Sequence, residues 1–271
     1  EIDLAEVVTP AVRALETPDR VTWHLDDAAR HAEPIAQLTA STPFSLDDAY
    51  GIQRASIERR IHRGESMVGV KLGFTSRAKM IQMGVDSLIW GWLTDAMLDE
   101  DGGRVALDRF IHPRVEPEVC FLTSREIDRP LTMLEASRYL EAVAPAMEII
   151  DSRYRDFRFT LEDVVADNCS SAGLVIGPWS KGFDSLRNAG VTMRIDGRIV
   201  QAGSTAAILG DPLRSIVQAS RLIAQSGLVL PAGSLIMAGA ATAAHPLPVD
   251  AHVHCVVNGL GSTEFTTYRL S

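Results

Sequence analysis

Two carboxylates stand two residues apart in the run HPRVEPEVCFL, which covers residues 112–122. If this run is a strand, Glu116 and Glu118 share one face, because alternate side chains of a strand point the same way. Like charges about 7 Å apart on one face repel each other unless a cation lies between them. Pro117 lacks a backbone N–H, which predicts a sheet edge or a bulge at this point. The stretch is therefore either an exposed acidic edge or part of a metal site.

A third carboxylate, Glu148, lies inside the apolar run AVAPAMEII. A buried carboxylate is costly unless it is paired or binds a metal, so an ion pair with Arg153 or Lys71 would also satisfy it. Three carboxylates without nearby histidines favour a hard cation, Mg²⁺ or Mn²⁺, over zinc. A metal held by three carboxylates keeps open positions, which suits catalysis. The sequence alone leaves open whether Glu148 meets the strand of Glu116 and Glu118.

A lysine stands between two glycines in MVGVKLG, where the hydrophobic pattern has period two. Lys71 shares its face with Gly69 and Gly73, which have no side chains and would leave space for a ligand. The alternative is a solvated lysine on a half-exposed strand.

The stretch DVVADNCSSAG contains a second group of polar residues, Asp167, Asn168, Ser170 and Ser171. They would bind a substrate carboxylate, orient a water, or form a turn that satisfies its own backbone. His252 and His254 share a strand face, but no third ligand is near them in the sequence, which indicates ordinary sheet residues. The chain lacks the motifs of serine hydrolases, zincins, P-loop NTPases and dinucleotide-binding folds.

The elements that must hold these residues change type along the chain. Residues 1–65 are expected to be helical, with a helix over residues 45–64 that begins with a capping box from Ser45 to Asp48 and stops at Gly64. A short helix and a Trp-Gly-Trp turn are expected within residues 76–98, and a helix that becomes a strand near Pro145. The remainder is mostly strands. The prediction is an α+β fold with a helical region 1–65 and a β-rich catalytic domain 66–271.

Composition excludes several classes of protein. With 26 Lys and Arg against 35 Asp and Glu, the net charge of −9 argues against a nucleic-acid surface. No stretch reaches the roughly 18 apolar residues of a membrane span, and the first residues lack a signal-peptide pattern. The three cysteines, Cys120, Cys169 and Cys255, form no CxxC pair. We therefore expect no disulfides and a cytoplasmic protein.

Five segments occur together in a familiar order: GVKLGFTS, GVDSLIWGWLTDAM, HPRVEPEVCFL, PAMEIIDSRYRDF and VVADNCSSAGLVIG. They resemble the fumarylacetoacetate hydrolase superfamily, in its hydratase/decarboxylase branch, from about residue 40 to the C-terminus. The resemblance implies a mixed β-roll or sandwich around a divalent-metal site. It places Glu116, Glu118 and Glu148 on the metal ligands, Lys71 on the active-site lysine and Ser170 beside the substrate.

The resemblance also bears on the reaction. The hydratases that the chain resembles carry an acid where this sequence has Ile89, and decarboxylation needs apolar surroundings for a departing carboxylate. Ile89, Trp90 and Trp92 suit that task, and Arg153 is expected to contact the substrate with them. The implied activity is metal-dependent decarboxylation of the 2-oxo dicarboxylate 2-oxohex-3-enedioate to 2-hydroxypenta-2,4-dienoate and CO₂ in meta-cleavage degradation of aromatic compounds.

Alternatives are a 2-hydroxypenta-2,4-dienoate hydratase, a C–C hydrolase or an oxaloacetate-type decarboxylase on the same scaffold, and a non-enzymatic partner of a hydratase. The C–C hydrolase branch typically has Asp as the third ligand, so Glu148 argues against it. The intact set of acids with Lys71 argues against a purely structural role. A homo-oligomer and a complex with a pathway hydratase are the expected assemblies.

Overall fold

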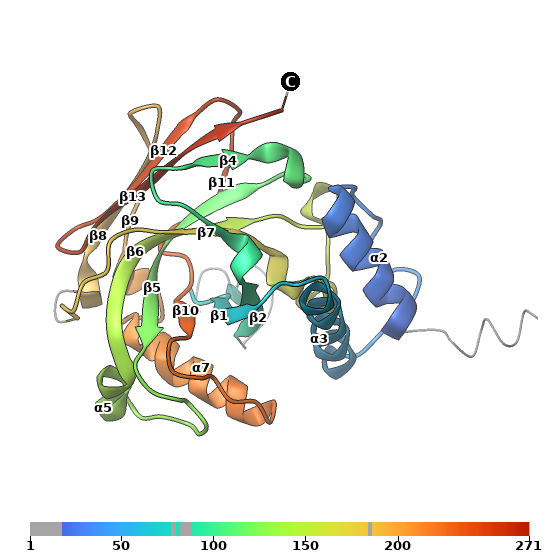
Figure 1. Ribbon diagram of the computed structural model, residues 1–271, viewed down its shortest axis with the longest axis horizontal. Helices are drawn as coiled ribbons and strands as arrows, with labels where there is room; N and C mark the ends of the chain where they lie inside the picture. The colour runs from blue at the N-terminus through green and yellow to red at the C-terminus, as the bar shows by residue number, and fades with distance from the viewer. Residues whose placement is uncertain (1–17, 77–79, 82–87, 184–185, 271) are drawn as a thin grey trace, which may run out of the picture.

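Two curled sheets form the centre of the protein (Figure 1). The computed structural model describes residues 18–76, 80–81, 88–183 and 186–270. The order of the larger sheet is β2-β1-β10-β5-β6-β7-β3, with β11 beside β5, and that of the smaller sheet is β4-β13-β12-β8-β9. Parallel pairs (β1 with β10, β3 with β7, β4 with β13) occur among antiparallel ones, so both sheets are mixed. The predicted α+β class and mixed β-roll are confirmed.

The strands of the larger sheet are β1 Met67–Gly73, β2 Ile89–Thr94, β3 Leu98–Asp99, β5 Arg114–Thr123, β6 Leu140–Ile150, β7 Ser171–Ile176, β10 Leu235–Met237 and β11 His245–Pro246. Those of the smaller sheet are β4 Arg104–Ala106, β8 Gly190–Ile195, β9 Arg198–Ser204, β12 His252–Val257 and β13 Gly261–Tyr268. The helices are α2 Pro18–His31, α3 Leu46–His62, α5 Met133–Ala136, α6 Leu161–Ala166 and α7 Leu213–Gln225. None of these described helices combines the length and apolar composition that a membrane crossing requires.

Local sequence signals explain where several elements begin and end. Ser45 caps α3, and its hydroxyl and the Asp48 carboxylate each accept the backbone N–H of the other residue, as the capping box predicts. The chain leaves this helix at Gly64, which has a left-handed φ of +103°. The strand β6 begins at Leu140, five residues before Pro145, because the helical pattern that precedes it forms only the single turn of α5 and a 3-10 turn at Ser137–Tyr139. The helix expected after Ser76 lies largely outside the described residues.

The main hydrophobic core lies between the two sheets and α7, where Val119 and Phe121 of β5 pack in the same cluster as Val253 and Phe265 of the smaller sheet. A second cluster joins α2 and α3, which lie together at one side of Figure 1, to α6 and Tyr154. The N-terminal helices therefore share a core with residues from the β-rich part. The division into regions 1–65 and 66–271 stays a prediction.

Candidate metal centre and active site

The antiparallel pairing of β5 with β6 brings the three acids together. Glu116 lies directly opposite Glu148 in the register, and Glu118 lies opposite Ala146. One carboxylate oxygen from each acid lies within 4.8 Å of the other two. The structure thus joins Glu148 to the other two acids, which the sequence could not establish.

This carboxylate cluster, Glu116, Glu118 and Glu148, is buried, with exposed fractions of 5%, 1% and 0%. Glu118 Oε2 accepts a hydrogen bond from the backbone N–H of Gly239 at 2.8 Å. Glu118 Oε1 and both oxygens of Glu148 form no aligned hydrogen bond with a described residue, although the Lys71 ammonium forms an ion pair with Glu148 Oε1. Buried carboxylate oxygens without donors cost free energy that a coordinated cation would offset. An all-oxygen donor set of this kind fits Mg²⁺ or Mn²⁺.

The electrostatics of the carboxylate cluster point the same way. Burial raises the pKa of Glu118 well above its usual range, and the charges of Glu148 and Glu116 raise it further. Burial also raises the pKa of Glu148, although Lys71 opposes that shift. Protonation of one of these carboxyl groups would relieve the repulsion, but a protonated carboxyl group is no longer a good metal ligand. A divalent cation removes the conflict because it favours all three ionised forms.

Lys71 lies in this site and is not a solvated lysine, since its exposed fraction is 4%. Its Nζ is 3.1 Å from Glu148 Oε1, an ion pair without the alignment of a hydrogen bond. Burial is the largest influence and lowers the pKa of Lys71, but the negative charges around it, with Glu148 first among them, together outweigh burial and raise that pKa above its usual value. Lys71 is therefore favoured as a cation while the neighbouring carboxylates are ionised.

The prediction that glycines leave ligand space beside Lys71 is wrong. A Cβ on Gly69 would lie 2.0 Å from the carbonyl oxygen of Leu235, and one on Gly73 would lie 2.7 Å from Ile89 Cγ1. The neighbouring strand β10 and the Ile89 side chain fill the space that the glycines open. These glycines allow close packing around Lys71, so any substrate must approach it from another side.

Pro117 does not mark a sheet edge or a bulge, because β5 has neighbours on both sides and pairs with β6 in unbroken register from Arg114 to Leu122. The chain on the other side leaves regular pairing between β10 and β11. There, Ala238 N donates to Val119 O and Ala241 N donates to Pro117 O. The missing N–H of proline therefore faces a gap in the neighbouring ladder.

The Trp-Gly-Trp segment is a strand, β2, and not a turn. Gly91 pairs with Lys71, so Ile89 and Gly91 share the face of Lys71, whereas Trp90 and Trp92 face the other way with Val70 and Leu72. Trp90 stacks on Tyr50 with ring centroids 5.6 Å apart. The structure therefore places Trp90 in the core behind the strand and not in the substrate space.

Arg153 also has a different surrounding from the one expected. Its guanidinium forms an ion pair with Asp167 through Nε, and its Nη2 donates to the Asp167 carbonyl oxygen at 2.6 Å. The Arg153 backbone N–H donates to Asp167 Oδ2 at 3.0 Å. Arg153 thus fixes the loop after α6 and is not free to hold a substrate carboxylate.

That loop contains Asn168, Cys169 and Ser170, whose φ angles are +47°, +53° and +59°. Left-handed backbone costs about 1–2 kcal/mol for each residue with a side chain, so surrounding contacts must enforce it. Ser170 Oγ is buried and has no hydrogen-bond partner among the described residues. The loop therefore leaves the Ser170 hydroxyl without a partner among the described residues, whereas the Asn168 carboxamide is hydrogen-bonded to the backbone of Trp92.

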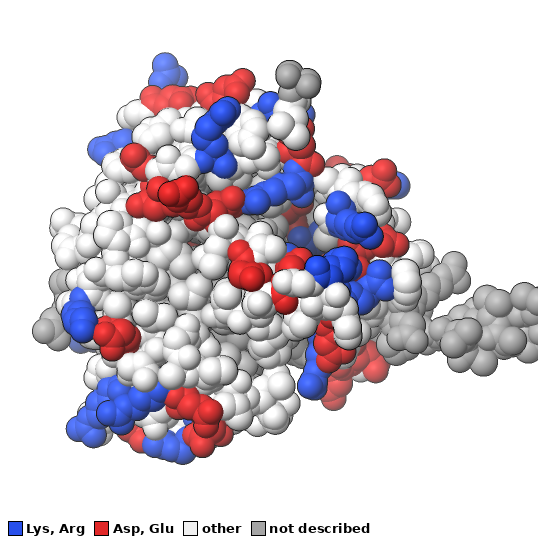
Figure 2. Space-filling view, in the orientation of Figure 1, with Lys and Arg blue, Asp and Glu red and all other residues white. Residues whose placement is uncertain are grey.

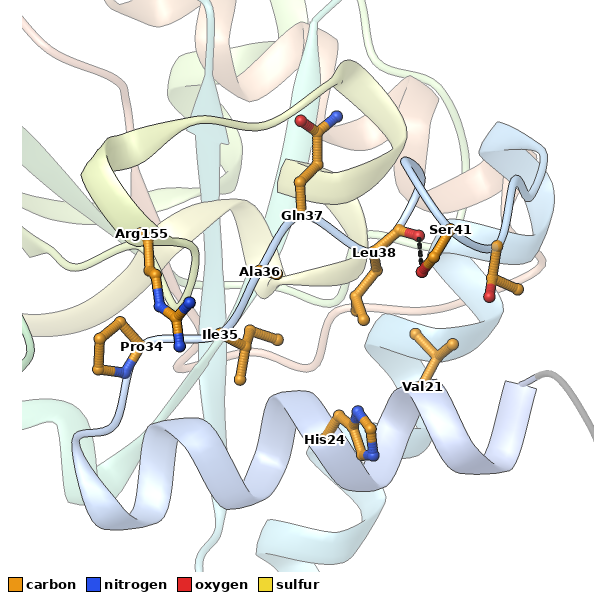
Figure 3. Close-up of a pocket in the computed structure, with 10 residues that line it drawn as sticks. Val21, His24, Pro34, Ile35, Ala36, Gln37, Leu38, Ser41 and Arg155 are labelled. Atoms are coloured by element: carbon orange, nitrogen blue, oxygen red, sulfur yellow. Dashed lines mark hydrogen bonds between the residues drawn. The ribbon is translucent and has the colours of Figure 1, made fainter.

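A cavity of about 600 Å³ lies away from this centre, between α2 and residues 34–42 (Figure 3). Its walls include Val21, Ile35 and Leu38, with His24 and Arg155 as basic groups. No carboxylate lines it among the described residues, so it offers a divalent cation no ligands of the kind found in the carboxylate cluster.

A mixed β-roll that carries a buried carboxylate cluster beside a lysine is the architecture of a metal-dependent enzyme. Residues 70–267 match the model of the fumarylacetoacetate (FAA) hydrolase C-terminal family, and the chain belongs to this family, in its hydratase/decarboxylase branch. The chain is 53% identical to a 4-oxalocrotonate decarboxylase of a Pseudomonas species over 248 residues. The aligned region covers 92% of this chain and 97% of the relative.

Two further relatives mark the branch. The chain is 36% identical to a 2-keto-4-pentenoate hydratase of Paraburkholderia xenovorans, over 91% of this chain and 94% of the hydratase. The structure superposes on 4-oxalocrotonate decarboxylase from Pseudomonas putida G7, complexed with magnesium and adipate, with a TM-score of 0.89 and 36% identity. That match covers 93% of this chain and 98% of the other.

Proposed function

We propose that this protein is a carbon–carbon lyase that decarboxylates 2-oxohex-3-enedioate (4-oxalocrotonate) to 2-hydroxypenta-2,4-dienoate and CO₂, within meta-cleavage degradation of aromatic compounds. The observation that carries the proposal is 53% identity with a 4-oxalocrotonate decarboxylase over 92% of the chain. The buried carboxylate cluster with Lys71 supports it, because the reaction moves negative charge onto an oxygen that needs cations nearby. The cofactor is a divalent cation, Mg²⁺ or Mn²⁺.

In this reaction the bond between C5 and the C6 carboxylate breaks and CO₂ leaves. The electron pair passes through C3=C4 to the C2 oxygen, which then takes a proton. When bound by Glu116, Glu118 and Glu148, Mg²⁺ or Mn²⁺ would supply Lewis-acid stabilisation of that oxygen. Lys71 adds positive charge beside the same carboxylate cluster, and its ammonium group is placed to give a proton to the product oxygen once that oxygen has taken up the electron pair.

Two residues are proposed to meet the substrate directly. Ser170 offers a hydroxyl that no described residue uses, so it is suited to bind a substrate oxygen. Ile89 shares the face of Lys71 and gives the departing carboxylate apolar surroundings. Trp90 and Arg153 hold these residues in place without touching the substrate. Trp90 anchors the strand beside Ile89 in the core, and Arg153 holds the loop of Ser170 through its ion pair with Asp167.

The decisive assay uses metal-stripped protein with Mg²⁺ or Mn²⁺ added back. With 2-oxohex-3-enedioate we expect metal-dependent CO₂ release and diene formation, and with 2-hydroxypenta-2,4-dienoate we expect no change. The second candidate is the hydratase, because the chain is also 36% identical to a 2-keto-4-pentenoate hydratase. Consumption of the diene without CO₂ release would assign hydration and reject the decarboxylase.

Replacement of Ile89 tests the apolar surroundings of the leaving group. We expect Ile89→Asp to release CO₂ about 10-fold more slowly than Ile89→Asn, because only the aspartate adds a negative charge near a departing carboxylate. The two variants remove the same apolar side chain, so their difference isolates the charge. The measurement is kcat for each folded variant, and equal values would show that Ile89 does not face the reacting carboxylate.

Assembly and location belong to the same proposal. We infer a homo-oligomer and a complex with a pathway hydratase; the broad area without charged side chains on one face of the molecule (Figure 2) would suit such contacts. Sedimentation of the protein alone and with the hydratase would test both. A monomer in the first run would contradict the homo-oligomer, and separate sedimentation of the two proteins in the second run would contradict the complex. A cytoplasmic location agrees with three buried cysteines that are all free thiols.

A further inference from the structure

The outer edge of β2 is closed by a side chain instead of by another strand. Among the described strands of the larger sheet, β2 is the terminal one, so within the described part of the chain the backbone groups of Trp92 on its far side have no neighbouring strand. Asn168 Oδ1 accepts the Trp92 N–H at 2.8 Å, and Asn168 Nδ2 donates to the Trp92 carbonyl oxygen at 2.9 Å. The carboxamide thus makes the same pair of bonds as a peptide group of an added strand.

Gly91 makes this approach possible. A Cβ at this position would lie 2.7 Å from the Asn168 carbonyl oxygen and 2.9 Å from Asn168 Oδ1. Both contacts are too close for any residue with a side chain, so the strand and the loop can meet only at a glycine. Gly91 is also the residue that pairs with Lys71 on the neighbouring strand β1.

The loop end of this connection is held independently. The backbone N–H of Asp151 donates to the Ser170 carbonyl oxygen at 2.9 Å. Arg153 forms an ion pair with Asp167 through its side chain and donates a hydrogen bond to it from its backbone N–H. These contacts fix where the left-handed segment starts and ends. The contact between Asn168 and Trp92 then fixes how far the segment lies from β2.

We propose that Asn168 is a positioning residue that sets the place of Ser170 relative to Lys71 across the active site. The connection runs from Ser170 to Asn168 within the loop, from Asn168 to Trp92 and Gly91 of β2, and from Gly91 to Lys71 through the sheet register. This inference rests on the proposed function, because it assumes that Ser170 and Lys71 act on one substrate. The carboxamide itself has both its groups engaged and does not touch the substrate.

Variants on the two sides of the contact test the proposal. We expect Asn168→Ala and Gly91→Ala to lower kcat/KM for CO₂ release about 10- to 100-fold, the loss typical of reacting groups displaced by about 1 Å. Both should also weaken adipate binding to the Mn²⁺-loaded protein. The Mn²⁺ affinity should change less than about threefold, because the carboxylate ligands lie on β5 and β6. Gly51→Ala, at a helical glycine with open space around it, is the matched control.

The outcomes separate three readings. Variants that fold, melt earlier and keep wild-type kcat/KM and adipate affinity would show a purely structural role and overturn the proposal. Parallel loss of Mn²⁺ binding would also overturn it, because the whole site would then have collapsed. If Asn168→Ala does not fold, Asn168→Asp keeps the size of the side chain and the acceptor for Trp92 N–H, and it should show the same pattern.

The adipate measurement also distinguishes this inference from the proposed function. A wild-type protein that binds adipate but releases no CO₂ would reject the decarboxylase. Weaker adipate binding by Asn168→Ala would still support the positioning role in that case, and unchanged binding would reject it.

Discussion

Glu118→Gln is expected to abolish metal binding and to lower the rate of CO₂ release at least about 1,000-fold while the protein stays folded. The substitution removes one ligand from the carboxylate cluster and leaves its shape unchanged. The glutamine oxygen can still accept the hydrogen bond that Gly239 donates to Glu118 Oε2. A fold defect is therefore not expected, and loss of turnover would report on the missing ligand charge.

Stability measurements give the same variant a second readout. In the metal-free protein the folded-state pKa of Glu118 is raised, so ionisation of this carboxyl destabilises the fold increasingly as pH rises above the unfolded value of about 4.3. Glutamine has no such cost. Metal-free Glu118→Gln should therefore melt at a higher temperature than the metal-free wild type near neutral pH. Mg²⁺ should raise the melting temperature of the wild type only.

The control for this experiment is Glu58→Gln on the exposed surface of α3, where Glu58 forms a solvent-exposed ion pair with Arg54. It should bind Mg²⁺ and turn over like the wild type, because exposed pairs contribute little. Titration calorimetry and melting curves with and without Mg²⁺ make the comparison. Full Mg²⁺ binding by Glu118→Gln would remove Glu118 from the ligand set.

Lys71→Met is expected to lower kcat about 1,000-fold and to leave metal affinity unchanged or increased. Methionine has a similar length and suits a buried position, but it has no charge and no proton to give. The ammonium lies 3.1 Å from Glu148 and competes with a metal for the negative charge of the carboxylate cluster. Its removal strengthens the attraction between the remaining carboxylates and a divalent cation.

The opposite directions of the two effects make this prediction specific. Mn²⁺ affinity, followed by the electron paramagnetic resonance of the free ion, and kcat are measured on the same preparation. Lys181→Met is the control, because Lys181 is 81% exposed at its side chain and pairs with Glu141 far from the carboxylate cluster. If metal affinity and kcat fall together in Lys71→Met, the lysine holds the ligands in place and is not needed for chemistry itself.

Short-range patterns explain the parts of the fold that the sequence predicts well. The helix α3 begins where the capping box of Ser45 and Asp48 indicates. Along β1, the alternation of side chains puts Lys71 on one face of the strand and Val70 and Leu72 on the other. These features depend on neighbours within a few residues, so they can be read directly. The same alternation places Glu116 and Glu118 on one face of β5, where the structure has them.

The sequence was least informative about which residues pack against a given strand. Alternation shows that Gly69 and Gly73 share the face of Lys71, but only the fold shows that Leu235 and Ile89 occupy the space above them. Pro117 was expected at an edge because its missing N–H is a local fact, whereas the gap between β10 and β11 that accommodates it is not.

By itself, the sequence determined the chemistry of this protein: three acids and a lysine in apolar surroundings, carried on segments that resemble one enzyme family. Only the tertiary structure decided which side chains share a space. The register of β5 with β6 sets Glu116 opposite Glu148, and that of β1 with β2 turns Trp90 away from Lys71. Both registers join strands that follow each other in the chain but are separated by segments too long for a tight turn to set the pairing. Their stability comes from hydrogen bonds and packing along whole strands, and no local pattern carries that information.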